Sequence, residues 1–243
     1  MKRTAPVTGS SRGIGKAAAE EFAKHGYDVV LNYVHSREKA EVFCEELKNK
    51  YGIEGIAVGA DLSKEKDVRE PAEKSLARFG KVDVLVNNAG IALYSEVAHK
   101  TVSDWDISLK TNLIAPFLLS QILGAEMVKN KYGKIINIAS IDAIYTYNAP
   151  SMEYDASKAA LINMTKNELQ PYVNVNCVAP GWVDTDMNKD LPQELIDYQL
   201  GRIYKKRFAK PEEVAKLVIF LAGDDAEFIN SEVIKIDGGY KLV

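Results

Sequence analysis

The sequence has little of what marks secreted, membrane-bound or metal-dependent proteins. It holds two cysteines, Cys44 and Cys177, whose spacing fits neither a metal site nor a disulfide framework. No run of about 18 consecutive apolar residues stands out, which is the length that crosses a bilayer. The opening stretch MKRTAPVTG is charged with no apolar run behind it, so we expect no secretory signal. These absences indicate a cytoplasmic protein with no membrane span.

An excess of positive charge is also missing. The formal net charge is −3 at pH 7, whereas non-specific binding to nucleic acid needs a basic surface. The three histidines, His25, His35 and His99, are scattered along the chain and form no candidate ligand cluster. We therefore expect neither a nucleic acid nor a metal ion among the ligands.

What is present is an ordinary globular composition, with 47% hydrophobic and 27% charged residues. A chain of 243 residues fits one α/β domain, because such sheets commonly reach about 250 residues. No linker, low-complexity tract or internal repeat divides it. We predict a single domain over residues 1–243.

Short runs rich in valine and isoleucine alternate with longer amphipathic segments. Runs such as DVLVN and KIINIA show little in/out alternation, as expected for strands covered on both faces. Regular β/α alternation predicts a seven-stranded, mostly parallel, doubly wound sheet with helices on both faces. The expected strands are Ala5–Thr8, Asp28–Tyr33, Gly55–Gly59, Val82–Asn87, Lys134–Ala139, Val173–Val178 and Val233–Ile236, and the expected helices include Ile14–His25, Arg37–Lys50, Ser103–Lys131 and Pro211–Ala222.

Two features depart from this regular pattern. Pro6 lies in the first expected strand, although proline cannot donate to a hydrogen-bond ladder and is rare in central strands. Residues 185–207 form a polar, helical-looking insertion between the last two strands. Insertions of this length are often functional, so we expect a substrate lid there.

The stretch TGSSRGIG, residues 8–15, lies between the first expected strand and the first expected helix. Gly9, Gly13 and Gly15 allow a tight turn, a close approach to phosphate and close helix packing. The helix N-terminus adds unpaired N–H groups and a positive dipole end. A P-loop is excluded because its glycine spacing differs and because Ala17 stands where Ser or Thr would bind magnesium. The stretch predicts a Rossmann-type dinucleotide site.

The end of the second strand indicates which dinucleotide is bound. It reads LNYVHSR, without the acid before Glu38 that usually binds the ribose 2′-hydroxyl of NAD. Instead Ser36 and Arg37 follow the strand, and Arg12 lies in the glycine loop. Guanidinium groups suit a 2′-phosphate because they form charge-assisted, bidentate contacts. We predict NADP(H) rather than NAD(H), with Arg37→Asp reversing the preference.

Further motifs follow in order: NNAG at 87–90, YDASK at 154–158, PGWVDT at 180–185 and IDGGY at 236–240. With the glycine loop, they resemble the short-chain dehydrogenase/reductase family over essentially the whole chain, most closely its 3-oxoacyl-[acyl-carrier-protein] reductases. The resemblance implies four catalytic residues, Asn112, Ser140, Tyr154 and Lys158. It implies a cofactor site formed by Gly9, Ser11, Arg12, Gly13, Ile14, Gly15, Ser36, Arg37, Asp61, Leu62, Asn88, Ala89, Gly90, Tyr154, Lys158, Pro180, Gly181, Val183 and Thr185.

The chemistry of YDASK can be argued from the residues themselves. Tyr154 and Lys158 are four positions apart and share one helix face. An ammonium about 5 Å away would favour the phenolate by roughly 3 kcal/mol, lowering the phenol's pKa by about two units. Tyr154 would then protonate the carbonyl oxygen while Ser140 hydrogen-bonds it. By the family pattern, Lys158 also holds the nicotinamide ribose, and Asn112 helps to pass protons through a bound water.

The sequence specifies the substrate less closely. The resemblance implies a 3-oxoacyl thioester on acyl carrier protein, but Thr146, Asn148 and Ser151 could bond sugar hydroxyls as easily as a pantetheine arm. A sugar, a steroid or a small ketone therefore stays open. A non-catalytic dinucleotide-binding protein is a further alternative, although such proteins typically lack the tyrosine or the lysine.

Partners are expected from charge and from the family pattern. Two basic groups could dock the acidic carrier protein: Lys129, Lys131 and Lys134, and Arg202, Lys205, Lys206 and Arg207 in the expected lid. The resemblance implies a homo-oligomer, a tetramer or dimer, that packs the helix at Ser103–Lys131 and the helix of Tyr154 against symmetry mates. The segment between Lys158 and the next strand is about one helical turn shorter than in most family members. Loss of nearly a whole turn keeps the geometry of Tyr154 and Lys158, but it reduces the apolar surface that packs against a symmetry mate.

Overall fold

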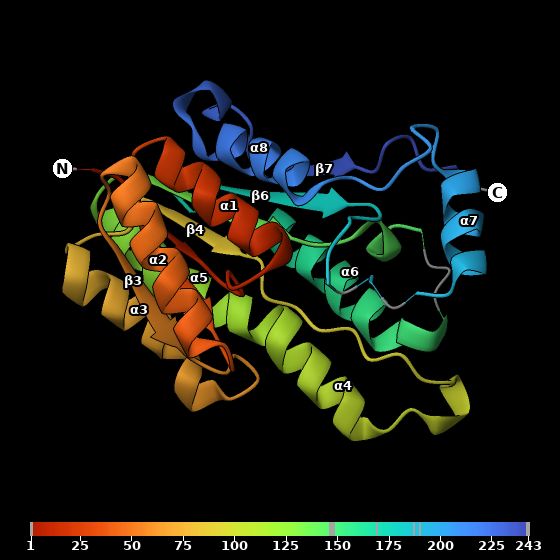
Figure 1. The fold of residues 1–243 in the computed structure, drawn as a ribbon. Coiled ribbons are helices and arrows are strands. Elements are labelled where there is room, and N and C mark those ends of the chain that lie inside the picture. Colours follow the sequence, from red (N-terminus) through yellow and green to blue (C-terminus); the bar gives the residue numbers. More distant parts are fainter. Residues whose placement is uncertain (1, 146–148, 169, 187, 190, 242–243) are drawn as a thin grey trace.

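The computed structural model describes residues 2–145, 149–168, 170–186, 188–189 and 191–241. They form one parallel sheet of seven strands, as predicted, and the strands lie in the order β3-β2-β1-β4-β5-β6-β7 (Figure 1). The strands are β1 (Thr4–Val7), β2 (Asp28–Tyr33), β3 (Gly55–Gly59), β4 (Val84–Asn87), β5 (Gly133–Ile138), β6 (Val173–Pro180) and β7 (Val233–Ile236).

Helices cover both faces of this sheet. One face carries α1 (Gly13–Lys24), α2 (Arg37–Tyr51) and α8 (Pro211–Ala222), with α1 packed beside α8. The other carries α3 (Glu65–Phe79), α5 (Ala115–Lys129) and α6 (Met152–Asn167), while α4 (Val102–Leu109) packs on α6. Helix α7 (Gln193–Arg202) lies apart from the sheet near the C-terminus (Figure 1).

The two faces bury separate hydrophobic cores. Phe22, Leu31 and Val218 belong to the core under α1, α2 and α8, whereas Leu119 and Ile135 belong to the core under α3 and α5. Every residue of β1, β4, β5 and β6 is buried, which explains why these runs lack in/out alternation.

The chain direction across the sheet reverses between β1 and β4. From β1 the chain first adds β2 and β3 on one side and then returns to add β4 on the other. The loops after neighbouring strands diverge at such a switch point and leave a crevice at the carboxyl ends of the strands. The topology therefore places a ligand site beyond the ends of β1 and β4.

The helix expected over Ser103–Lys131 runs without a break from Val102 to Lys129, but it is not α-helical throughout. It begins at Val102 after a capping box made by Thr101 and Asp104, and a π-helical turn at Lys110–Ile114 separates α4 from α5. By length and composition alone, Val102–Lys129 could cross a membrane, with a mean hydropathy of 1.3. Half of that apolar window is buried in the protein, as in a core helix.

Pro6 is buried in β1, between β2 and β4, and it changes the pairing with β4. On the β2 side Pro6 is in register with Val30, but toward β4 the register is confined to Val7 and Val86. The flanking amide of Thr8 donates to the Val86 carbonyl at 3.0 Å, whereas Pro6 has no N–H to offer. The ladder between these central strands is correspondingly short.

The connection from α6 to β6 folds back onto α5. Helix α6 ends at Asn167, and Gln170 pairs with Val173 in an isolated bridge. The Gln170 side chain lies so close to Gly124 that a Cβ there would be 2.8 Å from Nε2. Burial raises the pKa of the adjacent Glu168 to about 7, which nearby Ser120 only partly opposes. The short connection thus covers part of α5 with its own side chains.

Candidate active site

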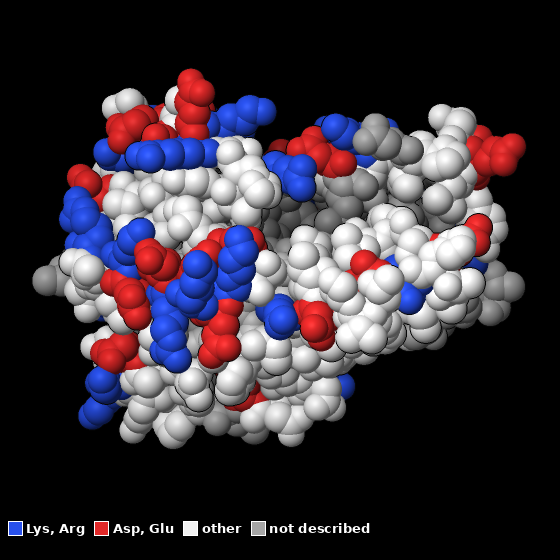
Figure 2. Space-filling model, turned by 90° about the horizontal axis from the view of Figure 1, so that it is seen from below, with Lys and Arg blue, Asp and Glu red and all other residues white. Residues whose placement is uncertain are grey.

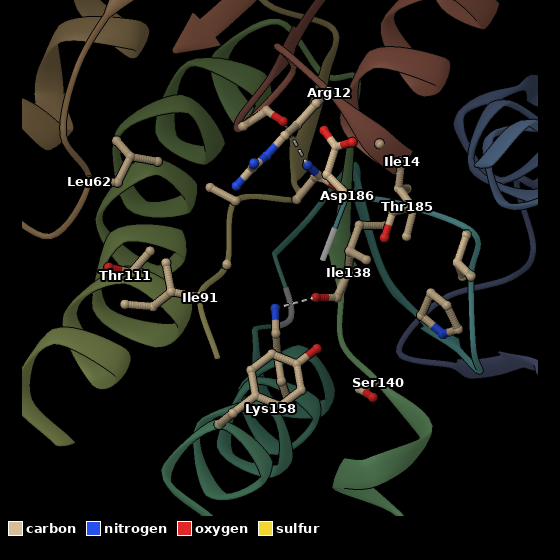
Figure 3. Close-up of a pocket in the computed structure, with 18 of the residues that line it drawn as sticks. Arg12, Ile14, Leu62, Ile91, Thr111, Ile138, Ser140, Lys158, Thr185 and Asp186 are labelled. Carbon is tan, nitrogen blue, oxygen red and sulfur yellow. Dashed lines mark hydrogen bonds between the residues drawn. The ribbon is translucent and has the colours of Figure 1, made fainter. Parts of the chain in front are cut away.

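A cavity of about 720 Å³ opens at the carboxyl ends of the strands, where the topology places a ligand site. The segments that follow β1 to β6 all contribute to its lining. Figure 3 shows Arg12, Thr185 and Asp186 at one end of it and Ser140 and Lys158 at the other. The predicted site residues that line it are Gly9, Ser11, Arg12, Gly13, Ile14, Ser36, Asp61, Leu62, Asn88, Ala89, Gly90, Ser140, Tyr154, Lys158, Pro180, Gly181, Val183 and Thr185.

The glycine loop has the backbone that a phosphate site needs. Gly9 and Gly13 have φ values of +62° and +55°, which residues other than glycine rarely adopt. A Cβ on Gly15 would lie 2.4 Å from Nδ2 of Asn88 and 2.5 Å from the Gly9 carbonyl oxygen. Helix α1 begins at Gly13 with no side-chain cap and no acid in its first turn, so its N–H groups can bind an anion. Gly15 does not line the cavity; it lets the loop close.

Two asparagines hold this loop in place. Nδ2 of Asn88 donates to the carbonyl of Thr8 at 2.8 Å, and the Thr8 hydroxyl accepts the backbone N–H groups of Asn88 and Ala89 at 2.9 Å each. Oδ1 of Asn32 accepts the N–H of Gly9 at 3.1 Å. Asn32 also lines the cavity, and sequence reasoning missed it. The available signal was a polar residue inside the buried run VVLNY.

The adenosine end of the cavity differs from the prediction at one residue. Arg12, His35 and Ser36 line it, but Arg37 does not. Nε of Arg37 pairs with Oε1 of Glu41 at 2.8 Å, and the Arg37 side chain is 76% exposed. Arg37 is the first residue of α2, so the i,i+4 pair with Glu41 draws its guanidinium along the helix. His35 is exposed and lies at the rim of the cavity.

Asp61 is held by its own turn. Its carboxylate accepts hydrogen bonds from the N–H and the hydroxyl of Ser63, at 3.1 and 2.7 Å, and pairs with Lys64 at 3.0 Å. Burial raises the pKa of Asp61, but the contacts with Ser63 and Lys64 outweigh this and hold it below its ordinary value. Asp61 therefore lies at the cavity as a charged group, beside Leu62.

Ser140, Tyr154 and Lys158 meet at the other end of the cavity, as predicted. Ser140 follows β5, and Tyr154 and Lys158 lie on α6. The Ser140 hydroxyl lies near the Tyr154 phenol, and Nζ of Lys158 lies 5.7 Å from the centre of the Tyr154 ring. Nζ of Lys158 also donates to the Ile138 carbonyl at 2.7 Å (Figure 3).

The expectation that Lys158 lowers the pKa of Tyr154 is wrong. The protein atoms around the phenol desolvate it and raise its pKa; the carboxylate of Asp142 adds to this, and the bond from Ser140 only partly opposes it. Burial also lowers the pKa of Lys158 to about 8, because desolvation disfavours the ammonium. Tyr154 is thus a fully protonated acid at neutral pH, and Lys158 is largely charged below pH 8.

Asn112 is close to this centre but does not line the cavity. It is buried in the π-helical turn, where its Oδ1 accepts the N–H of Ile91 at 2.9 Å. Its Nδ2 donates to the Ile91 carbonyl and to the Ser157 hydroxyl, both at 2.9 Å. Asn112 therefore joins the loop after β4 to α6, close to Tyr154. π-helical turns often occur at functional sites, and this one directs Asn112 inward.

The segment after β6 forms the remaining wall. Gly181 is packed so tightly that a Cβ would lie 2.9 Å from the Cα of Asp237. Trp182 lines the cavity and stacks on Phe208 at 5.6 Å, and Asp186 and Asn188 bring the start of the expected lid into the wall. Of the candidate substrate contacts, Thr146 and Asn148 fall outside the described residues, and Ser151 is buried and does not line the cavity.

One of the two predicted docking groups is wrong. Lys129, Lys131 and Lys134 lie around the end of α5 and the start of β5, at the sheet edge opposite the cavity. Lys134 is buried and pairs with Glu227. In the other group, Lys205, Lys206 and Arg207 are exposed next to α7, and Arg207 pairs with Glu213 at 2.6 Å. Only this second group lies on the side of the cavity.

Comparison with known proteins agrees with this geometry. A family model described as Enoyl-(Acyl carrier protein) reductase matches residues 9–241. The chain belongs to the short-chain dehydrogenase/reductase family. It is 38% identical to the 3-oxoacyl-[acyl-carrier-protein] reductase FabG of Staphylococcus epidermidis, covering 98% of this chain and 99% of that protein. It is 39% identical to the enzyme of the same name from Aquifex aeolicus, covering 96% and 95%.

Solved structures of similar short-chain dehydrogenases share the fold closely. A blue fluorescent protein from a metagenomic library, in complex with NADPH, has a TM-score of 0.92 and 34% identity, covering 99% of this chain and 98% of that one. A short-chain dehydrogenase from Burkholderia cenocepacia, in complex with NADP, has a TM-score of 0.91 and 35% identity, covering 98% and 97%. The chain is a short-chain oxidoreductase.

Proposed function

We propose that this protein reduces a carbonyl to a hydroxyl with NADPH, and that its substrate is a 3-oxoacyl thioester carried by acyl carrier protein. The observation that carries the proposal is the convergence of Ser140, Tyr154 and Lys158 at the inner end of the cavity. The relatives named 3-oxoacyl-[acyl-carrier-protein] reductase, at 38 and 39% identity over nearly full length, support the substrate.

The residues present fit a dinucleotide. A side chain at Gly15 would fill the space where the loop closes, and the uncapped start of α1 offers its N–H groups to a pyrophosphate. Arg12, with His35 and Ser36, would hold the 2′-phosphate that distinguishes NADP(H). When bound, NADPH supplies a hydride to the carbonyl carbon.

The chain's own residues supply the rest of the chemistry. The Ser140 hydroxyl holds the carbonyl oxygen, and Tyr154, protonated at neutral pH, donates its proton to that oxygen as negative charge develops there. Lys158 is anchored at the Ile138 carbonyl and keeps a positive charge near the phenol when the proton has left. Asn112 fixes the loop at Ile91 against α6, so that these groups stay aligned.

A second copy of the chain is the proposed partner of the α4–α5 face. Val102 is 77% exposed, and Ile107, Ile114 and Phe117 are also exposed along these helices. Figure 2 shows few charged side chains over the part of the surface that α4 forms, in contrast to the charged region over α2 and α3. Exposed apolar surface of this kind favours association. We place the assembled enzyme in the cytoplasm.

The activity is tested by following NADPH absorbance with acetoacetyl-acyl carrier protein. Tyr154→Phe removes the acid and should lower kcat by at least a hundredfold, which is the usual contribution of general acid catalysis. Tyr172→Phe makes the same change at an exposed position and should leave the rate unaltered. Equal rates for wild type and Tyr154→Phe would refute the mechanism, and no turnover by wild type would refute the substrate.

A further inference from the structure

The segment after β4 forms part of the cavity wall without regular secondary structure. Residues 88–96 belong to no helix or strand, and Ile91 and Tyr94 line the cavity. Backbone N–H and C=O groups outside helices and strands need other partners to be held in place. Asn112 supplies such partners at Ile91. A second anchor lies next to Tyr94.

Lys100 and Glu153 form this second anchor, at Leu93. Glu153 directly precedes Tyr154 in α6, and its Oε1 accepts the N–H of Leu93 at 3.3 Å. Nζ of Lys100 donates to the carbonyl of Leu93 and lies 2.7 Å from Oε2 of Glu153. The side chains are 4% exposed for Lys100 and 0% for Glu153. Both backbone groups of Leu93 are thus held by buried, charged side chains.

Stability alone does not account for a buried ion pair of this kind. Desolvating two charges costs about as much as their attraction contributes, so apolar residues of similar volume are often equally stable. Apolar residues cannot reproduce the match to Leu93, where the carboxylate faces an N–H and the ammonium faces a carbonyl. The N–H of Ser95 donates to the carbonyl of Pro150 at 3.1 Å, which ties the segment to the turn before α6 as well. These contacts align the wall with the helix that carries Tyr154.

We propose that Lys100 and Glu153 are positioning residues for carbonyl reduction, because they fix Tyr94 in the cavity wall relative to Tyr154. Tyr94 directly follows Leu93, and Tyr154 directly follows Glu153, so the anchor joins the immediate neighbours of two tyrosines that line the cavity. A substrate between them is then held against the phenol that protonates it. Misplacement by about 1 Å can lower the rate by about a hundredfold. The inference rests on the proposed carbonyl reduction.

The test removes one charge and then both. Glu153→Gln leaves the Lys100 ammonium buried without a countercharge and should lower Tm by roughly 10 °C. The double variant Lys100→Met/Glu153→Met should recover most of that loss, because the partly exposed Leu93 can hydrogen-bond water instead. Its kcat/KM with acetoacetyl-acyl carrier protein should nevertheless stay at least about tenfold below wild type. A role in stability alone would restore Tm and kcat/KM together.

Two further measurements do not depend on turnover. Hydrogen exchange over a peptide of residues 91–96 should be slow in wild type, where the amides of Leu93 and Ser95 are bonded, and faster in the double variant. The Kd of NADPH, measured by its fluorescence, should stay within about twofold of wild type in the double variant. The glycine loop is held by Asn88 and Asn32, which the substitutions leave in place.

The exposed ion pair of Lys74 and Glu70 on α3, 2.6 Å apart, gives a matched control, and Lys74→Met/Glu70→Met should change none of these measurements. Wild-type kcat/KM in the Lys100/Glu153 double variant overturns the inference. Unprotected exchange of residues 91–96 in wild type overturns it even if that variant does not fold. A Kd of NADPH that rises with the loss of activity also overturns it. No turnover by wild type, with the expected exchange and Tm values, refutes the proposed function and supports the anchor at Leu93.

Discussion

Replacing Lys158 by methionine should abolish turnover and yet stabilise the fold. Lys158 is 2% exposed, and burial lowers its pKa from the ordinary 10.5 to about 8. At 1.36 kcal/mol per pKa unit, keeping this ammonium in the folded protein at pH 7 costs about 3 kcal/mol. Methionine has a similar volume and no charge, so it removes this cost without leaving a large cavity.

One loss opposes this gain. The Ile138 carbonyl accepts from Nζ of Lys158 at 2.7 Å, and an acceptor left without its donor costs about 1–3 kcal/mol. The net gain expected at pH 7 is therefore about 1 kcal/mol, which corresponds to a rise in Tm of about 2–4 °C for a chain of this size.

The pH dependence tests the origin of the effect. Because the folded pKa of Lys158 is depressed, the unfolded chain binds more protons between about pH 8 and pH 10.5. The destabilisation by Lys158 is complete below pH 8 and disappears as the pH rises toward 10.5. The free energy of unfolding of Lys158→Met relative to wild type should thus fall by about 2 kcal/mol between pH 7 and pH 9.5.

Urea denaturation at the two pH values measures this difference directly. Lys166→Met makes the same replacement at an exposed position of α6 and should change stability by less than about 0.5 kcal/mol at either pH. A relative stability of Lys158→Met that does not change with pH would show that the ammonium is not desolvated as the structure indicates.

Two other predictions concern cofactor choice and assembly. Arg12→Ala should reduce the kcat/KM preference for NADPH over NADH by about tenfold, whereas Arg37→Ala should change it little because Arg37 is bound to Glu41. The reverse order in the kinetics of the two variants would contradict the structure. Phe117→Glu should shift the protein toward monomer in light scattering, since it places a charge on the exposed apolar face of α5; an unchanged mass would place the interface elsewhere.

The sequence predicted the sheet and the reaction centre because both depend on local patterns. Buried strands read as continuous apolar runs, and the spacing of Tyr154 and Lys158 on one helix fixes their common face. Ser140 was predicted from the family resemblance, and it follows β5 at the carboxyl end of the sheet, where the other loops converge.

The errors share a different cause. The direction of the Arg37 side chain depends on its pairing with Glu41. The π-helical turn contains Asn112, whose side chain bonds Ile91 and Ser157 in other parts of the chain. The pKa of Tyr154 depends on how many protein atoms surround it. These are tertiary effects, and charge spacing along the sequence carries no measure of desolvation.

Burial links the chemistry of this site to its cost in stability. The same desolvation lowers the pKa of Lys158 and raises that of Tyr154. It therefore keeps Tyr154 protonated, while the charged Lys158 destabilises the folded state. The half-buried Asp142 at the same end of the cavity also raises the pKa of Tyr154. An apolar end would fold more stably, but it would lack the proton donor and the cation beside it. The cost in stability is thus tied to groups that act only when a dinucleotide and a carbonyl substrate are bound.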